Sequence, residues 1–334
     1  SEPHHRMSGN AAEAKELVKQ GEKALNKKNM FFKKSPDWET AADCYQKAAV
    51  IFRTPAVKML PEAIAAFEKA AEAHGKNQAH FYAAAAMENA GNILRDMKAL
   101  AAAGQHYEKA SQYFLDAGKA DKAAELLLKS AKALAEEDVD ASISQYKRAI
   151  TLYVEDEQAI FIGDTWRQCL ALMLKHDKKD QAVEFLNSMF PTFEALDQGE
   201  YLRRCQLAVV ILLLAKGDCV AAAAARDSYG DFMMSNEGEA ACDLIDAFEE
   251  GSDDKVKEIV ATQTFTLLEN QVARLASKLP AICLECASDM TGARSNTRPA
   301  AKKVEAGEGG GGGAAAGGGA ADDGDDDDMD DLMQ

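Results

Sequence analysis

The sequence predicts an all-α protein, a solenoid of helical hairpins that continues into a C-terminal helical bundle and a disordered acidic tail. Three observations predict it. Apolar residues recur at i, i+3, i+4 and i+7 from about Ala12 to Leu279, and strand-like alternation appears nowhere at useful length. A short motif returns about every 40 residues. Ten acidic residues and no basic residue lie between Glu305 and Gln334.

The chain begins with residues 1–10, which we assign to a disordered start. Ser1 to Arg6 precede Met7 and are expected to be cloning leftovers. The helical repeat domain is predicted over residues 11–216.

The repeat motif is an aromatic residue, any residue, a basic residue and alanine. It occurs at Tyr45–Ala48, Phe67–Ala70, Tyr107–Ala110 and Tyr146–Ala149, with a degenerate copy at Phe185–Ser188. A unit near 40 residues holds two helices and their turns, so the design is tetratricopeptide-like, although the standard unit has about 34 residues. Small residues at fixed steps should let helices approach closely, with an aromatic ring opposite.

After Gly217 this spacing is lost. Turn signals at Asn236–Gly238 and Gly251–Asp254 separate shorter helices, which predict a compact helical bundle over residues 217–280. Residues 281–334 are predicted to be a linker and a disordered Gly/Ala/Asp-rich tail, because they lack the apolar content to offset the entropy of ordering.

The formal net charge of −17 is concentrated in that tail. Without its ten carboxylates the remaining chain carries −7. An acidic surface argues against nucleic-acid binding, which needs Lys and Arg to displace phosphate counterions. The longest apolar run, Leu207–Ala215, is far shorter than the roughly 20 residues of a membrane-spanning helix. Seven scattered cysteines favour a reducing compartment, so the expected location is cytoplasmic.

Known catalytic patterns are missing from the sequence. Cys283 and Cys286 form a lone CxxC with no second pair of ligands, so no metal site is predicted. The glycine run Gly309–Gly313 lacks the Gly-Lys-Ser/Thr of a phosphate loop. We therefore expect a protein that is not an enzyme and that needs no cofactor.

Three features can carry an interaction, and the first is a loop between the first two helical segments. Its central residues are Met30, Phe31, Phe32, Lys33 and Lys34. The phenylalanines can enter lipid, at about 1.5–3 kcal/mol each, while the lysines lie against anionic headgroups. In the alternative interpretation, a phenylalanine folds back onto the following helix.

The second feature is the basic residue of each repeat. Repeats place equivalent residues in a row, so one face can present a series of cations to an acidic rod-like partner. In the alternative interpretation, these residues are solvated at the helix surface or form ion pairs within their own helix. For any single basic residue this is the commoner role. The cations are Lys47, Lys69, Lys109 and Arg148, with Lys129 and Arg167 in the paired helices.

The third feature is the acidic segment Asp325–Gln334. Acidic tails usually solubilise a protein. This one includes Met329, Leu332 and Met333, for which solvation alone has no use. An acidic and apolar peptide on a flexible tether is a plausible ligand for a basic pocket.

The order of these pieces resembles the soluble NSF attachment proteins, or SNAPs, the adaptors of the N-ethylmaleimide-sensitive fusion ATPase. The resemblance covers roughly residues 11–280. Its Lys-x-Pro-Asp loop is more similar to the γ branch than to the α and β branches. The matching segments are Phe31–Asp37, Ala41–Phe52, Ala84–Leu94, Gln105–Ala110, Gly230–Phe232 and Ala240–Glu249.

The resemblance implies an adaptor in vesicle trafficking and membrane fusion. Several copies would surround a SNARE four-helix complex and recruit the NSF-type hexameric ATPase that disassembles it. Phe31 and Phe32 would contact the membrane, giving a cytoplasmic protein that associates peripherally with membranes. The SNARE contacts would come from Lys69, Lys109, Lys129, Arg148 and Arg167, and the ATPase contact from Asp330, Asp331 and Leu332.

The ending departs from the α pattern, in which the acidic-leucine segment directly follows the bundle. Here about 40 residues of linker intervene, by comparison with that family pattern, and Met333 and Gln334 follow the leucine. The alternative function is a general tetratricopeptide-like scaffold or co-chaperone, although no convincing set of Asn and Lys residues for a carboxylate clamp is present. An enzyme with an unrecognised site is the least favoured interpretation.

Overall fold

The computed structural model describes residues 2–27, 36–156 and 159–279. These residues form helices and no strand, which confirms the predicted all-α class. The elements are α1 (Glu2–Leu25), α2 (Trp38–Arg53), α3 (Leu60–Lys76), α4 (His80–Asp96), α5 (Leu100–Asp116), α6 (Ala120–Leu134), α7 (Val139–Glu155), α8 (Ala159–Lys175), α9 (Lys179–Ala195), α10 (Gly199–Ala215), α11 (Cys219–Ser228), the 3-10 helix η1 (Gly230–Met234), α12 (Asn236–Glu249), α13 (Asp253–Val260), α14 (Gln263–Thr266) and α15 (Asn270–Ala276).

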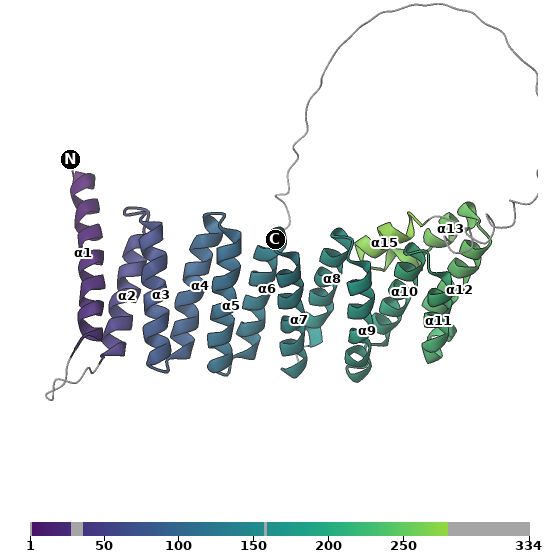
Figure 1. Ribbon diagram of the computed structural model, residues 1–334, viewed down its shortest axis with the longest axis horizontal. Coiled ribbons are helices and arrows are strands. Elements are labelled where there is room, and N and C mark those ends of the chain that lie inside the picture. The colour runs from purple at the N-terminus through teal and green to yellow at the C-terminus, as the bar shows by residue number, and fades with distance from the viewer. Residues whose placement is uncertain (1, 28–35, 157–158, 280–334) are drawn as a thin grey trace, which may run out of the picture. The chain divides into compact units, whose positions relative to one another are not determined.

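Helices α1 to α10 stand side by side in chain order, each packed against the next (Figure 1). This is the helical-hairpin solenoid that the repeat motif predicts. The first helix begins at Glu2. Residues 2–10, which the sequence analysis assigns to a disordered start, therefore continue α1 toward its N-terminus.

Many of the turns between helices share one geometry. Among the described residues, seven turns are three residues long and have a middle residue with a positive φ of 52° to 83°. In each, the last turn residue donates its N–H to a carbonyl five positions earlier, as Ala79 does to His74 at 2.9 Å, which is a Schellman motif. The positive-φ residues are Gln78, Lys98, Gly118, Asp177, Asp197, Gly217 and Gly251. The first six lie 20 residues apart in two sets of three, so a 40-residue repeat contains two helices of equal length.

Glycines let adjacent helices approach closely where an aromatic ring lies opposite. A Cβ at Gly21 would lie 2.8 Å from the ring of Tyr45, and one at Gly91 would lie 2.8 Å from the ring of Tyr107. Both tyrosines are buried. Normal carbon–carbon contacts are about 3.5–4.0 Å, so neither position has room for a methyl group. The expected pairing of small residues with aromatic rings is therefore present.

The buried residues form two hydrophobic cores that meet at α6. The first core runs from Ala14 to Leu126, and the second from Ala124 to Leu279. Helix α6 contributes Ala123 and Leu126 to the first core, and Ala124, Leu127 and Ala131 to the second. The predicted boundary at 216/217 does not interrupt the packing, because the second core continues across it.

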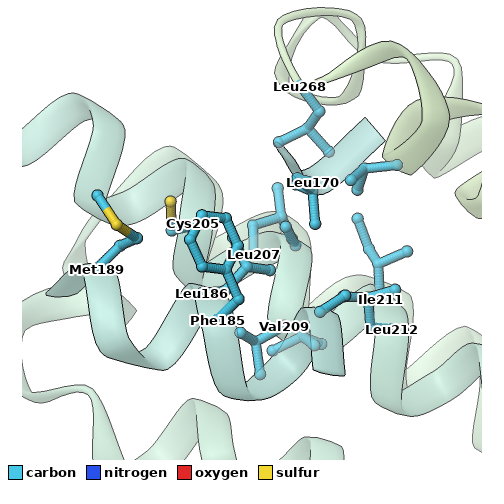
Figure 2. Packing of buried hydrophobic residues seen from close by; sticks show 14 of the residues in the cluster. Leu170, Phe185, Leu186, Met189, Cys205, Leu207, Val209, Ile211, Leu212 and Leu268 are labelled. Atoms are coloured by element: carbon cyan, nitrogen blue, oxygen red, sulfur yellow. The ribbon is translucent and has the colours of Figure 1, made fainter. Parts of the chain in front are cut away.

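Helix α10 lies at the centre of the second core. All ten residues from Cys205 to Leu214 are buried, including the apolar run noted in the sequence except its last residue, Ala215. A helix that is apolar on every side needs neighbours on every side, and α10 packs against α9, α11, α12 and α15. Figure 2 shows Leu268, from the segment between α14 and α15, close to Leu170 of α8. The C-terminal helices therefore complete the core of the repeats.

Candidate functional site

Ion pairs and hydrogen bonds connect each helix with the next but one. Neighbouring helix axes lie about 8–10 Å apart, so in a flat row the side chains of α1 and α3 could not meet across α2. Lys69 of α3 nevertheless lies 2.9 Å from Glu22 of α1. The helices therefore alternate between two layers, which we call the odd layer (α1, α3, α5, α7, α9) and the even layer (α2, α4, α6, α8, α10).

Three polar contacts link α1, α3, α5 and α7 of the odd layer. Besides the Lys69–Glu22 pair, His106 Nε2 of α5 lies 2.7 Å from a carboxylate oxygen of Glu68 in α3. Arg148 of α7 lies 2.5 Å from Glu108 of α5. The second ring nitrogen, His106 Nδ1, lies 2.8 Å from the Ala102 carbonyl oxygen, so both ring nitrogens have a hydrogen-bonding partner.

The even layer has an equivalent series. Lys129 of α6 lies 2.7 Å from Glu88 of α4, and Lys175 of α8 lies 2.7 Å from Glu136 at the end of α6. The Lys175 ammonium, by hydrogen bonding, holds the pKa of the Glu136 carboxyl below its ordinary value. Arg167 of α8 donates to the Tyr201 hydroxyl of α10 at 3.0 Å, and its guanidinium lies 5.2 Å from the centre of that ring.

The structure divides the predicted cations between the two layers. Lys69, Lys109 and Arg148 lie in the odd layer, whereas Lys129 and Arg167 lie in the even layer. Lys69, Lys129 and Arg148 pair with an acid one repeat earlier in the chain. Among the residues that the structure describes, Lys109 is exposed and has no ion pair, and the same holds for Lys47 in α2.

Lys109 borders a groove of about 660 Å³ between α3 and α5, with Met87 of α4 on its floor. Glu68 and Glu72 form the α3 wall, and Lys109, Gln112 and Tyr113 form the α5 wall. The groove therefore offers an apolar floor between an acidic and a basic wall.

A second groove of about 340 Å³ lies one step earlier in the odd layer, between α1 and α3 over α2. Its lining is almost entirely apolar, and three lysines stand around it against one glutamate. The lining residues are Lys15, Val18, Lys19, Phe52, Glu62, Ala65, Ala66 and Lys69. We call it the α1–α3 groove.

The predicted membrane loop, Met30 to Lys34, lies outside the described residues, but the chain on either side of it is held together. The Asp37 N–H donates to the Ala24 carbonyl at 3.1 Å, and Lys27 pairs with the Asp37 carboxylate at 3.3 Å. Asp37 also caps α2 by accepting from the Thr40 N–H, and this bond lowers its pKa. The loop therefore starts and ends at one point of the fold.

The acidic segment with Asp330, Asp331 and Leu332 also lies outside the described residues, as do Cys283 and Cys286. Within the part of the chain that the structure describes, no group of three His, Cys, Asp or Glu residues is placed to hold a metal ion. No described helix is long and apolar enough to cross a bilayer.

The sequence analysis missed the contacts between repeats. A signal was present, because Glu68 and His106, Glu88 and Lys129, and Glu108 and Arg148 are each separated by 38 to 41 residues, one repeat. Pairing within a helix, where partners are three or four residues apart, does not reveal this spacing.

Comparison with known proteins agrees with this architecture. The family model "Soluble NSF attachment protein, SNAP" matches residues 12–265. A gamma-soluble NSF attachment protein of Dictyostelium discoideum is 32% identical over 275 residues, which is 81% of this chain and 84% of the relative. One of Arabidopsis thaliana is 27% identical over 269 residues, covering 79% and 89% of the two chains. The chain therefore belongs to the soluble NSF attachment protein family, whose members are adaptors, and its relatives lie in the gamma branch.

Proposed function

We propose that this chain binds assembled SNARE four-helix complexes and recruits the NSF-type hexameric ATPase that disassembles them in vesicle trafficking. The match to the SNAP family model over residues 12–265 carries the proposal. Pull-down with an assembled SNARE complex and the ATPase tests it. Retention of the ATPase only when both the chain and the SNARE complex are present is the expected result, and recovery at background level would refute the proposal.

The odd layer is the face that we assign to the SNARE complex. It has two adjacent grooves, and its cations Lys69, Lys109 and Arg148 follow one another along alternate helices. A four-helix complex with an acidic surface needs such a row of cations. Lys109 forms no ion pair among the described residues, so it need not break one in order to bind an acidic partner. In this assignment Lys129 and Arg167, in the even layer, do not contact the SNARE complex; they join α6 to α4 through Glu88 and α8 to α10 through Tyr201.

Charge reversal at one exposed lysine of each layer tests the choice of face. Lys109→Glu should weaken SNARE binding, with a steeper loss at low salt, because an exposed interface charge acts mainly through long-range attraction. Lys132→Glu in α6 is the matched control, because Lys132 is also exposed and has no ion pair in the described chain. Equal loss in the two variants would contradict the assignment.

The loop residues Met30, Phe31, Phe32, Lys33 and Lys34 are the proposed membrane contact. The closed base of the loop supports this because the ion pair of Lys27 with Asp37 holds the two ends of the loop together. Phe31→Ser with Phe32→Ser should slow the disassembly of SNARE complexes held in liposomes and leave detergent-solubilised complexes unaffected. An unchanged rate in liposomes would make the loop structural. This contact places the protein at the cytoplasmic side of membranes, peripherally associated.

The acidic-leucine segment, with Asp330, Asp331 and Leu332, is the proposed ATPase contact. Its charge fits a basic receptor surface, and its leucine gives an apolar anchor. Deleting residues 325–334 should weaken recruitment of the ATPase while SNARE binding stays intact. Full recruitment by the truncated chain would return the segment to a solubilising role.

A further inference from the structure

The α1–α3 groove has the lining of a peptide-binding site. Phe52 is buried at its base, and Val18, Ala65 and Ala66 supply the remaining apolar surface. Small alanines on α3 leave room that a larger side chain would fill. An apolar groove between two helices is a common receptor for an amphipathic helix, which inserts side chains at i, i+3 and i+4.

The lysines around this groove favour an acidic ligand. Lys15 and Lys19 are four residues apart on α1, so they stand one above the other on the same face. Lys15 has no ion pair among the described residues, and Lys19 is 74% exposed with Glu16 only at 4.0 Å. On the other wall Lys69 pairs with Glu22, and Glu62 is the single acid in the lining.

The sequence contains a ligand of this chemistry. In the segment Asp325–Gln334 the apolar residues Met329, Leu332 and Met333 have the spacing i, i+3 and i+4, and six aspartates surround them. In a helix these three side chains would share one face, and the carboxylates would flank it. Residues 305–334 contain no basic residue, so contact with lysines is electrostatically favourable for this acidic segment.

We propose that the α1–α3 groove binds the acidic segment Asp325–Gln334 of a second copy of this chain. Met329, Leu332 and Met333 enter the apolar groove, and the aspartates face Lys15, Lys19 and Lys69. The contact joins different surfaces of the two copies, so it links copies head to tail. It does not rest on the proposed function: the groove lies in the layer, and the segment in the contact, that the proposed function gives to the SNARE complex and the ATPase, so the contact between copies belongs to the chain that is free of both partners.

Sedimentation equilibrium of the full chain at low ionic strength, without SNARE complex or ATPase, tests the proposal. The wild-type chain should self-associate, and the association should weaken as salt is added. Lys15→Glu with Lys19→Glu should weaken it about tenfold, because two attractions become repulsions. Ala65→Trp should weaken it comparably without a charge change, because it fills the groove from an exposed position. Lys98→Glu with Lys132→Glu, at exposed positions outside the groove, is the charge-matched control and should have no such effect.

A mixing experiment identifies the two surfaces. Leu332→Asp with Met333→Asp alters only the acidic segment, and this variant and the Lys15→Glu, Lys19→Glu variant should each be monomeric alone at a concentration where the wild-type chain is partly associated. Mixed together they should form a heterodimer, because one supplies the groove and the other the segment. A mixture that stays monomeric, or a wild-type chain that does not self-associate, would overturn the proposal. Neither result would bear on SNARE binding, which the pull-down measures separately.

Discussion

Replacing Gly91 with alanine is expected to destabilise the protein, although alanine is the better helix former. Gly91 lies in the interior of α4, where alanine alone would stabilise the helix by about 1 kcal/mol. The added Cβ, however, would lie 2.8 Å from Tyr107 Cε1 and 2.9 Å from Cδ1. The ring cannot easily move away, because Tyr107 is 1% exposed and its hydroxyl donates to Asn92 at 2.9 Å.

The magnitude follows from these opposing effects. A contact about 0.7 Å shorter than the van der Waals minimum forces the two helices apart, and overpacking of this kind costs about 1–3 kcal/mol. After subtraction of the gain in propensity, we expect a loss of about 1 kcal/mol. Urea denaturation followed by circular dichroism measures it.

Gly163→Ala is the matched control in α8. There the nearest atom to a Cβ is the Tyr201 hydroxyl at 3.3 Å, a contact that needs a shift of only a few tenths of an ångström. This variant should be neutral or slightly stabilised. If the free energy of unfolding of Gly91→Ala rose as much as that of Gly163→Ala, the close approach of α4 to α5 would not explain why glycine occupies position 91.

Three further outcomes are expected. Arg148→Met and Glu108→Gln should each lower the free energy of unfolding by about 0.2–1 kcal/mol, because the ion pair is partly exposed. The double variant should lose no more stability than one single variant, and strictly additive losses would show that the two side chains do not interact. Burial raises the pKa of Tyr146 to about 12, so the folded state keeps a proton that the unfolded chain releases near pH 10. This group should therefore leave the free energy of unfolding unchanged below pH 10 and lower it between pH 10 and about 12. In Tyr146→Phe the free energy of unfolding should fall less steeply over this range, and curves of equal slope for the two proteins would contradict this. Cys169 and Cys205 are buried, and burial raises the pKa of both thiols, so a thiol reagent should modify half-buried Cys44 and Cys242 before these two, as mass mapping of the labelled chain can check.

The helical class and the repeat could be predicted because both leave a periodic record in the sequence. The apolar spacing marks the buried stripe of each helix, and the aromatic motif marks the ring that fills the space beside a small residue, as Tyr107 does at Gly91. The turn positions could not be predicted in the same way. Four of the seven Schellman turns place a residue other than glycine at positive φ, among them Lys98 and Asp197, so no glycine marks them.

The assignment of cations to faces also needed the structure. Lys109 and Lys129 are both exposed lysines in the middle of helices, and only the alternation of helices between two layers separates them. The pairs across one repeat follow from that alternation, which depends on how each hairpin packs on the next. The membrane loop and the acidic segment remain predictions, because they fall outside the described residues.

Helix α6 has a consequence for how the molecule opens. Its two faces belong to different cores. Unfolding that starts at α1 can therefore spread through the first core, but α6 remains packed through its other face against the second core. In a chain of neighbour-only contacts such a helix stops the spread of disorder. Backbone amides should therefore exchange with deuterium in two kinetic groups, divided at α6. A surface carried by α1–α5 can then loosen and re-form on its partner while the second half keeps its shape.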